Sequence, residues 1–281
     1  MRFDQVAIPL VPRNTSNCLD LSVCFLRHYL APIGALWASV AVPACVLTYV
    51  LVERYEFTMW LAIVAFFFAT SPLGVLLMSG AAPCAFGEPF TFRGTWARLG
   101  WRGIGLLAKG LALRCLIGAG FLLFLFPGWY VAMRTGFFVE QAALSNMARH
   151  LHDRRADELL KGEIGDLYVR SAGVFIFCAL LWLVMLITAD FLSEHLLGFP
   201  LLFGRLGVDP QYLRDADGVR YVARSLWGDP VVVTAALAVA LLVYPIGRLA
   251  WFFCYVDVRV RRDCWDMELQ IMQEAERLEA V

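Results

Sequence analysis

The sequence predicts an all-α protein, a polytopic transmembrane bundle of six helices with both termini in the cytoplasm. Three observations lead to this prediction: the composition, a set of long uncharged stretches, and the distribution of arginine and lysine along the chain. Of the 281 residues, 60% are hydrophobic and only 17% are charged. An ordinary soluble domain is about 45–50% apolar and about 25% charged, so a single soluble core does not account for this chain.

The charge balance excludes two further classes of protein. Lys and Arg together number 24, as do Asp and Glu, so the formal net charge at pH 7 is zero. Nucleic-acid-binding domains are normally basic, and this balance gives no support to a nucleic-acid partner. Disordered chains are highly charged and poor in apolar residues, unlike this one. The remaining class is a multi-pass membrane protein, whose first partner is the lipid bilayer.

Long uncharged stretches set the number of membrane spans. A helix needs roughly 20 apolar residues to cross a hydrocarbon core about 30 Å thick. Five stretches contain no Asp, Glu, Lys or Arg: residues 31–52, 57–87, 115–133, 171–189 and 230–247. The third contains Pro127-Gly128, a pair typical of turns. Either this stretch is one span, which gives five, or the pair is the tip of a hairpin between two helices, which gives six.

The positive-inside rule favours six spans, because Lys and Arg near span ends prefer the cytoplasm. With the N-terminus inside, the five-span model places 12 of the 24 basic residues on each side. The six-span model places 15 inside, five outside and four within spans. The chain is then one membrane domain, 1–281, with these parts: a cytoplasmic arm (1–27), spans near 31–52, 58–80, 104–126, 129–148, 170–192 and 230–256, and a cytoplasmic tail helix (257–281).

The tail carries an apolar stripe. Residues at three- and four-residue spacing share one face of a helix, and such a face suits a partner helix. The stripe consists of Cys264, Met267, Ile271, Ala275 and Leu278. It docks either on a protein partner or on the cytoplasmic loops of the chain itself, and the sequence leaves both alternatives open.

Ionisable residues within the predicted spans are the candidate functional residues, because charges inside a membrane are costly. There are six of them: Lys109, Arg114, Arg134, Glu140, Asp190 and Arg248. Counted from the hairpin tip, Arg114 lies about 13 residues back and Glu140 about 12 forward, so antiparallel helices would hold them at one depth, roughly 19 Å from the tip. We expect an Arg114–Glu140 ion pair, which either fixes the helix register or forms a substrate or proton site. A weaker expectation pairs Arg134 with Asp190.

No set of residues typical of catalysis, of a metal or of a cofactor is evident. His150-x-His152 is the only metal-like spacing, and residues two apart do not share a helix face. Intramembrane hydrolysis usually needs paired acids, Ser and His, or a metal at depth. The eight cysteines include no CxxC pair and lie in predicted spans or near the reducing cytoplasmic side, so we expect free thiols. The sequence therefore predicts no enzyme, no cofactor and no metal site.

Two stretches carry a resemblance to known proteins. One is Phe126-Pro127-Gly128-Trp129-Tyr130, followed by Arg134 and Glu140, and the other is the run Tyr255–Asp263, which contains Tyr-x-Asp-x-Arg-x-Arg. Together they resemble a group of bacterial six-span proteins. These are akin to the membrane domain attached to some glycerophosphodiester phosphodiesterases and to the uncharacterised YciC-like inner-membrane proteins. The resemblance implies a helical membrane domain in the bacterial inner (plasma) membrane, working beside other envelope proteins, without phosphodiesterase activity.

Two functional hypotheses follow. The first is a non-enzymatic integral membrane subunit that anchors or assembles partner envelope proteins, motivated by the striped tail and the lack of catalytic sets. The second is a transporter or lipid-handling protein that uses an intramembrane Arg/Glu polar site, to which anionic headgroups would suit the positive residues. A water-accessible cavity that reaches Arg114 would favour the second hypothesis, and a closed, packed core would favour the first.

Overall fold

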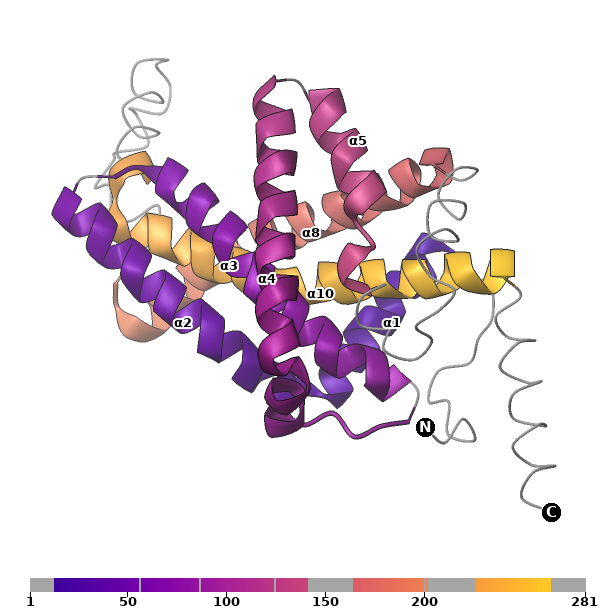
Figure 1. The fold of residues 1–281 in the computed structure, drawn as a ribbon. Helices are drawn as coiled ribbons and strands as arrows, with labels where there is room; N and C mark the ends of the chain where they lie inside the picture. Colours follow the sequence, from indigo (N-terminus) through magenta and orange to yellow (C-terminus); the bar gives the residue numbers. More distant parts are fainter. Residues whose placement is uncertain are drawn as a thin grey trace. The chain divides into compact units, whose positions relative to one another are not determined.

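The computed structural model describes residues 13–55, 57–85, 87–123, 125–140, 164–199, 201 and 226–263. All regular elements in these ranges are helices, and no strand occurs among them, which confirms the predicted all-helical class (Figure 1). The elements are α1 (Thr15–His28), α2 (Leu30–Tyr55), α3 (Met59–Ala85), α4 (Phe92–Leu123), α5 (Leu125–Thr135), α8 (Ile164–Leu192), the short π-helix η2 (Ser193–Leu197) and α10 (Pro230–Asp263).

Five helical segments in the described part of the chain are long and apolar enough to cross a membrane. They are Leu30–Tyr55, Met59–Ala85, Gly103–Phe121, Gly165–Leu196 and Pro230–Arg261. These segments coincide with five of the six predicted spans, so the chain has the character of a multi-pass membrane protein. Helix α10 continues to Asp263, beyond the predicted end of the last span at residue 256.

The sixth predicted span, 129–148, is only partly described. Helix α5 has 11 residues, fewer than a membrane crossing requires, and a turn at Gly136 and Phe137 follows it. Residues 141–163 lie outside the described part, as does the tail stripe of Cys264, Met267, Ile271, Ala275 and Leu278. The sixth span and the tail helix therefore stay predictions.

The predicted hairpin is present, with its tip a few residues earlier than Pro127-Gly128. Helix α4 ends at Leu123 and α5 begins at Leu125, and the two helices pack against each other (Figure 1). Pro127 lies in the first turn of α5, where a missing N–H costs no intrahelical hydrogen bond. A Cβ on Gly128 would lie 2.6 Å from the ring and backbone of Phe121, so the absence of a side chain allows this close approach.

Glycine also breaks α4 near its beginning. Gly100 has a φ of +41° and a ψ of −154°, a conformation that L side chains rarely adopt, and it interrupts the helical path. The segment before it contains exposed Phe92 and Trp96 and buried Leu99, as an amphipathic helix at a membrane interface would. The apolar segment Gly103–Phe121 follows the break.

The chain forms two compact units. Unit 1 comprises residues 1–36, 71–176 and 245–281, and unit 2 comprises residues 37–70 and 177–244. Helices α2, α3, α8 and α10 each contribute residues to both units, whereas α4 and α5 belong to unit 1 alone.

The core of unit 2 is built from small and branched apolar residues of α2, α3 and α10. Its buried members are Ala41, Val52, Ala62, Ala69, Val233, Leu237 and Leu241. Polar side chains at its edge donate to helix carbonyls: Tyr244 Oη lies 2.9 Å from the Thr70 oxygen, and Trp182 Nε1 lies 3.0 Å from the Ala236 oxygen. Within hydrocarbon such carbonyls have no water to bind, so these bonds link the helices at low desolvation cost.

Unit 1 contains the second half of α3, whose side chains are almost fully buried, together with α1 and the end of α10. The ring of Phe25 on α1 lies 6.3 Å from that of Phe90 and 6.0 Å from that of Phe253, measured between centroids. A Cβ on Gly80 would lie 1.9 Å from the Phe90 ring, so only glycine fits there. The seven cysteines in the described ranges are free thiols, as predicted.

Candidate functional site

The buried carboxylate of Asp257 accepts hydrogen bonds from three separate donors. It lies in α10, within the Tyr-x-Asp-x-Arg-x-Arg run, and its side chain is 1% exposed. Arg261 lies one helical turn further on, on the same face, and its Nε donates to the carboxylate at 3.1 Å. The helix itself therefore supplies the first partner of the buried charge.

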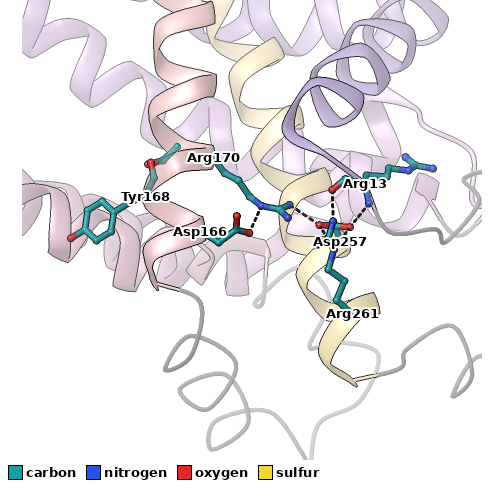
Figure 2. A network of polar contacts seen from close by, with 7 residues as sticks. Arg13, Asp166, Tyr168, Arg170, Asp257 and Arg261 are labelled. Atoms are coloured by element: carbon teal, nitrogen blue, oxygen red, sulfur yellow. Dashed lines mark hydrogen bonds and ion pairs between the residues drawn. The ribbon is translucent and has the colours of Figure 1, made fainter.

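Two more partners come from distant parts of the chain (Figure 2). Arg170 of α8 donates from Nη1 to Oδ2 of Asp257 at 2.6 Å, and the backbone N–H of Arg13 donates to Oδ1. The contact with Arg13 is doubled, because Arg261 Nη2 also donates to the Arg13 carbonyl at 2.8 Å. One carboxylate thus joins the N-terminal arm, the beginning of α8 and the end of α10.

Arg170 is the buried cation of this group, and it has two carboxylate partners. Its side chain is 5% exposed, and its Nε donates at 2.6 Å to Asp166, which lies one turn earlier on α8 and is half exposed. We call Arg13, Asp166, Arg170, Asp257 and Arg261 the Asp257 cluster (Figure 2). Its two carboxylates balance the guanidinium groups of Arg170 and Arg261, and this balance is what makes burial of charge tolerable.

A pair of buried thiols lies in the same unit. Cys18 of α1 and Cys254 of α10 are both 0% exposed and share a hydrogen bond. That hydrogen bond lowers the pKa of the Cys18 thiol, against the opposing effect of burial, and the positive charges of Arg170 and Arg13 act in the same direction as the bond. The thiols therefore extend the polar contact between α1 and α10.

A second buried charge pair joins Glu140 to Arg248 of α10. Glu140 is completely buried, Arg248 is 13% exposed, and Nη2 of Arg248 lies 2.8 Å from Oε1 of Glu140. Neither Nε nor Nη2 of Arg248 forms a hydrogen bond, although both are buried. The contact is therefore an ion pair by distance rather than a well-formed hydrogen bond.

The segment that carries Glu140 is held by aromatic contacts with α10. Trp251 Nε1 donates to the Gly136 carbonyl at 3.2 Å, and the rings of Phe137 and Trp251 stack with centroids 4.8 Å apart. A Cβ on Gly136 would lie 3.2 Å from the Trp251 ring, so glycine permits this approach. These contacts place Glu140 beside Arg248, one turn before Trp251.

The ion pair predicted from the sequence was wrong in one partner, because Glu140 pairs with Arg248 and not with Arg114. The depth count assumed an unbroken helix from the tip to Glu140. Instead, α5 ends at Thr135, and the turn at Gly136 and Phe137 directs the next residues toward α10. Arg114 is partly buried on α4 and takes part in an interaction of its own.

The other candidate residues lie apart from this pair. Lys109 is exposed on α4. Asp190 is buried near the end of α8 and accepts the backbone N–H of Leu201 at 2.9 Å. Arg134 lies in α5, but its side chain is outside the described part, so the expected Arg134–Asp190 pairing stays a prediction.

Sequence reasoning missed Arg170, Asp257 and Arg13 as site residues. The sequence predicts candidates only among charges within the spans, whereas Arg170 and Asp257 lie at the predicted cytoplasmic ends of the spans near 170–192 and 230–256. Two signals were available: the i, i+4 pairs Asp166/Arg170 and Asp257/Arg261, and the Tyr-x-Asp-x-Arg-x-Arg run itself.

The described residues contain no group of three or more His, Cys, Asp or Glu side chains that could hold a metal ion. His150 and His152 lie outside them. Comparison of the chain with protein-family models, with curated proteins and with solved structures finds no match.

Proposed function

We propose that this protein is a non-enzymatic integral membrane subunit of the bacterial inner membrane that anchors or assembles partner envelope proteins. The observation that carries the proposal is the Asp257 cluster. It fastens the N-terminal arm to the end of α10, so that the arm and the tail that follows α10 emerge from one place. This junction between Arg13 and the end of α10 would serve as the base of a docking platform for partners.

The partners of the buried carboxylates support a structural role for these groups. Asp257 has three donors, Asp190 accepts a backbone N–H, and Glu140 has Arg248 as its counter-ion. A catalytic acid or base needs a reacting atom within hydrogen-bond reach, and these groups face the protein's own arginines and amides instead. Such engagement favours fixed packing over chemistry.

The same contacts support a topology in which both termini share one side. Arg13 and Asp257 are neighbours, so the beginning and the end of the described helices meet. Together with the excess of basic residues predicted on the cytoplasmic side, this favours a cytoplasmic arm and tail. We also propose kinship with the YciC-like group, on the two sequence stretches named above.

The tail stripe provides the test of partner assembly. Ile271→Asp places a charge in the centre of the stripe, whereas Gln273→Asp adds the same charge two residues away, on another helix face. We expect tagged full-length protein with Ile271→Asp to lose its co-purifying envelope proteins by at least about tenfold, because burial of an unpaired charge opposes docking. The Gln273→Asp variant should retain them, as measured by quantitative mass spectrometry. Identical partners in wild type and both variants would reject the proposal.

One observation favours the second function, a transporter or lipid-handling protein. Both carboxylate oxygens of Glu140, and Nε and Nη2 of Arg248, are buried without a hydrogen bond, so the pair has unused polar capacity. A headgroup or a proton would use it. If purified protein in proteoliposomes moves fluorescent phosphatidylglycerol between leaflets and Glu140→Gln abolishes this movement, the second function holds. Movement no faster than in protein-free vesicles rejects it.

A further inference from the structure

The α4–α5 hairpin differs from the other long helices of the described chain in the compact unit to which its residues belong. Helices α2, α3, α8 and α10 each have residues in both compact units, but α4 and α5 lie entirely in unit 1. Helix α4 is 32 residues long, which corresponds to about 48 Å.

Contacts near both ends of the hairpin are made within unit 1, with α1, the end of α3 and the beginning of α8. At its base, Phe90 packs against Phe25, just before α2, while Thr95 is buried beside Gly80 near the end of α3. Just after its tip, Trp129 Nε1 donates to Ser171 Oγ at 3.2 Å, and its ring lies 6.0 Å from that of Tyr168, at the beginning of α8.

A hairpin that crossed the membrane would carry its base and its tip to opposite sides. The beginnings of α2 and α8 and the ends of α3 and α10 all lie in unit 1. Because base and tip both contact this one set of helix ends, the hairpin returns to the level at which it began. The break at Gly100 allows the change of direction that such a path requires.

The surface of α4 is apolar and mostly exposed, which indicates that lipid covers it. The segment Gly103–Phe121 has a mean hydropathy of 1.6, and only 6% of it is buried within the protein. Ile104, Leu116 and Phe121 are 57%, 55% and 43% exposed. An apolar surface of this length is not stable in water. Lys109 is exposed on the same segment, and its long side chain can carry its charge to the headgroups while the stem stays among acyl chains.

We propose that the α4–α5 hairpin lies within a single lipid leaflet, at the side of the membrane where Arg13 contacts Asp257, and does not cross the bilayer. The chain then has four crossings, α2, α3, α8 and α10. This number is even, as the contact between Arg13 and Asp257 requires for termini on one side. The partner of the exposed α4 face is the acyl-chain layer of that leaflet.

A depth profile of single spin labels tests the proposal in full-length protein reconstituted in lipid nanodiscs. Labels are placed at Ile104, Ala112 and Phe121 of α4 after the reactive native cysteines have been replaced with serine. The matched control is α8, which contributes to both units, with labels at its exposed residues Val169, Leu180 and Phe191. The relative accessibility to oxygen and to a water-soluble nickel complex reports the depth of each label.

The two arrangements predict different profiles. On α8, the middle label should lie about 16 Å deeper than the two outer labels, because 11 residues separate neighbouring labels along a crossing helix. On α4, we expect the three labels to lie at nearly the same depth. A middle label at Ala112 that lies about 12 Å deeper than both Ile104 and Phe121 would show that α4 crosses the membrane, and the proposal would then be wrong.

Discussion

Replacement of Asp257 with asparagine is expected to lower the free energy of unfolding by about 3–5 kcal/mol. The substitution preserves shape but leaves Arg170, 5% exposed, without its buried counter-charge. It also weakens the acceptor of the Arg13 N–H and of Arg261. Reversible unfolding in mixed detergent micelles measures the loss. The matched control is Asp166→Asn, which removes a half-exposed carboxylate from the same arginine and should cost no more than about 1 kcal/mol.

A local measurement separates loss of the cluster from general destabilisation. Trypsin cleaves after arginine, and Arg13 is held by Asp257 and Arg261. Under native conditions we expect cleavage after Arg13 to become at least about tenfold faster in Asp257→Asn, because the arm then opens more easily. A tenfold change corresponds to a decrease of about 1.4 kcal/mol in the free energy of local opening. The rate should not change in Asp166→Asn. Equal effects of the two variants on stability and on cleavage would show that Asp257 is not the central group.

Replacement of Arg248 with methionine is the second substitution with a large expected effect. It leaves the carboxylate of Glu140, which is completely buried, without its cation. Removal of one partner of a buried pair typically costs about 3–5 kcal/mol. The exposed Lys109 provides the control, since Lys109→Met removes a cation that is not buried and should change the free energy of unfolding by no more than about 0.5 kcal/mol.

A double variant distinguishes loss of charge compensation from loss of packing. Glu140→Gln combined with Arg248→Met removes both charges, and it should be more stable than Arg248→Met alone, because no isolated charge is then buried. The measurement is the same unfolding experiment, analysed as a double-mutant cycle. If Glu140→Gln brings no recovery in the Arg248→Met background, the ion pair does not contribute to the folded state.

The positions of the long helices were predictable because they depend on local information. Each span requires a stretch of about 20 uncharged, apolar residues, and such stretches can be read without knowledge of the rest of the chain. The hairpin was predictable to within a few residues, since Pro127-Gly128 lies in the first turns of α5, just after the break between Leu123 and Leu125. Both features follow from the chemistry of neighbouring residues.

The charge pairs were not predictable to the same degree. Arg170 and Asp257 are 87 positions apart, and no local pattern states which arginine a buried aspartate will meet. The assignment of Arg114 to Glu140 failed for a related reason. The predicted depth of Glu140 was counted along a helix assumed to be continuous, so any break in the helix makes the count wrong. The turn at Gly136 is such a break, and after it the carboxylate lies beside α10. The helical i, i+4 pairs are the exception, because both members lie within one turn of a single helix.

The contact between the N-terminal arm and α10 also has a consequence for the order of folding. Arg13 and Asp257 are separated by 244 positions, and the ribosome makes the N-terminal part first. The arm therefore has no docking site until the last helix has been synthesised and inserted. Until then Arg170, already placed at the beginning of α8, lacks its buried counter-charge. In a chain that stops before Asp257, Arg170 has only the half-exposed Asp166 as a counter-charge, so the contact with Asp257 marks the completion of assembly.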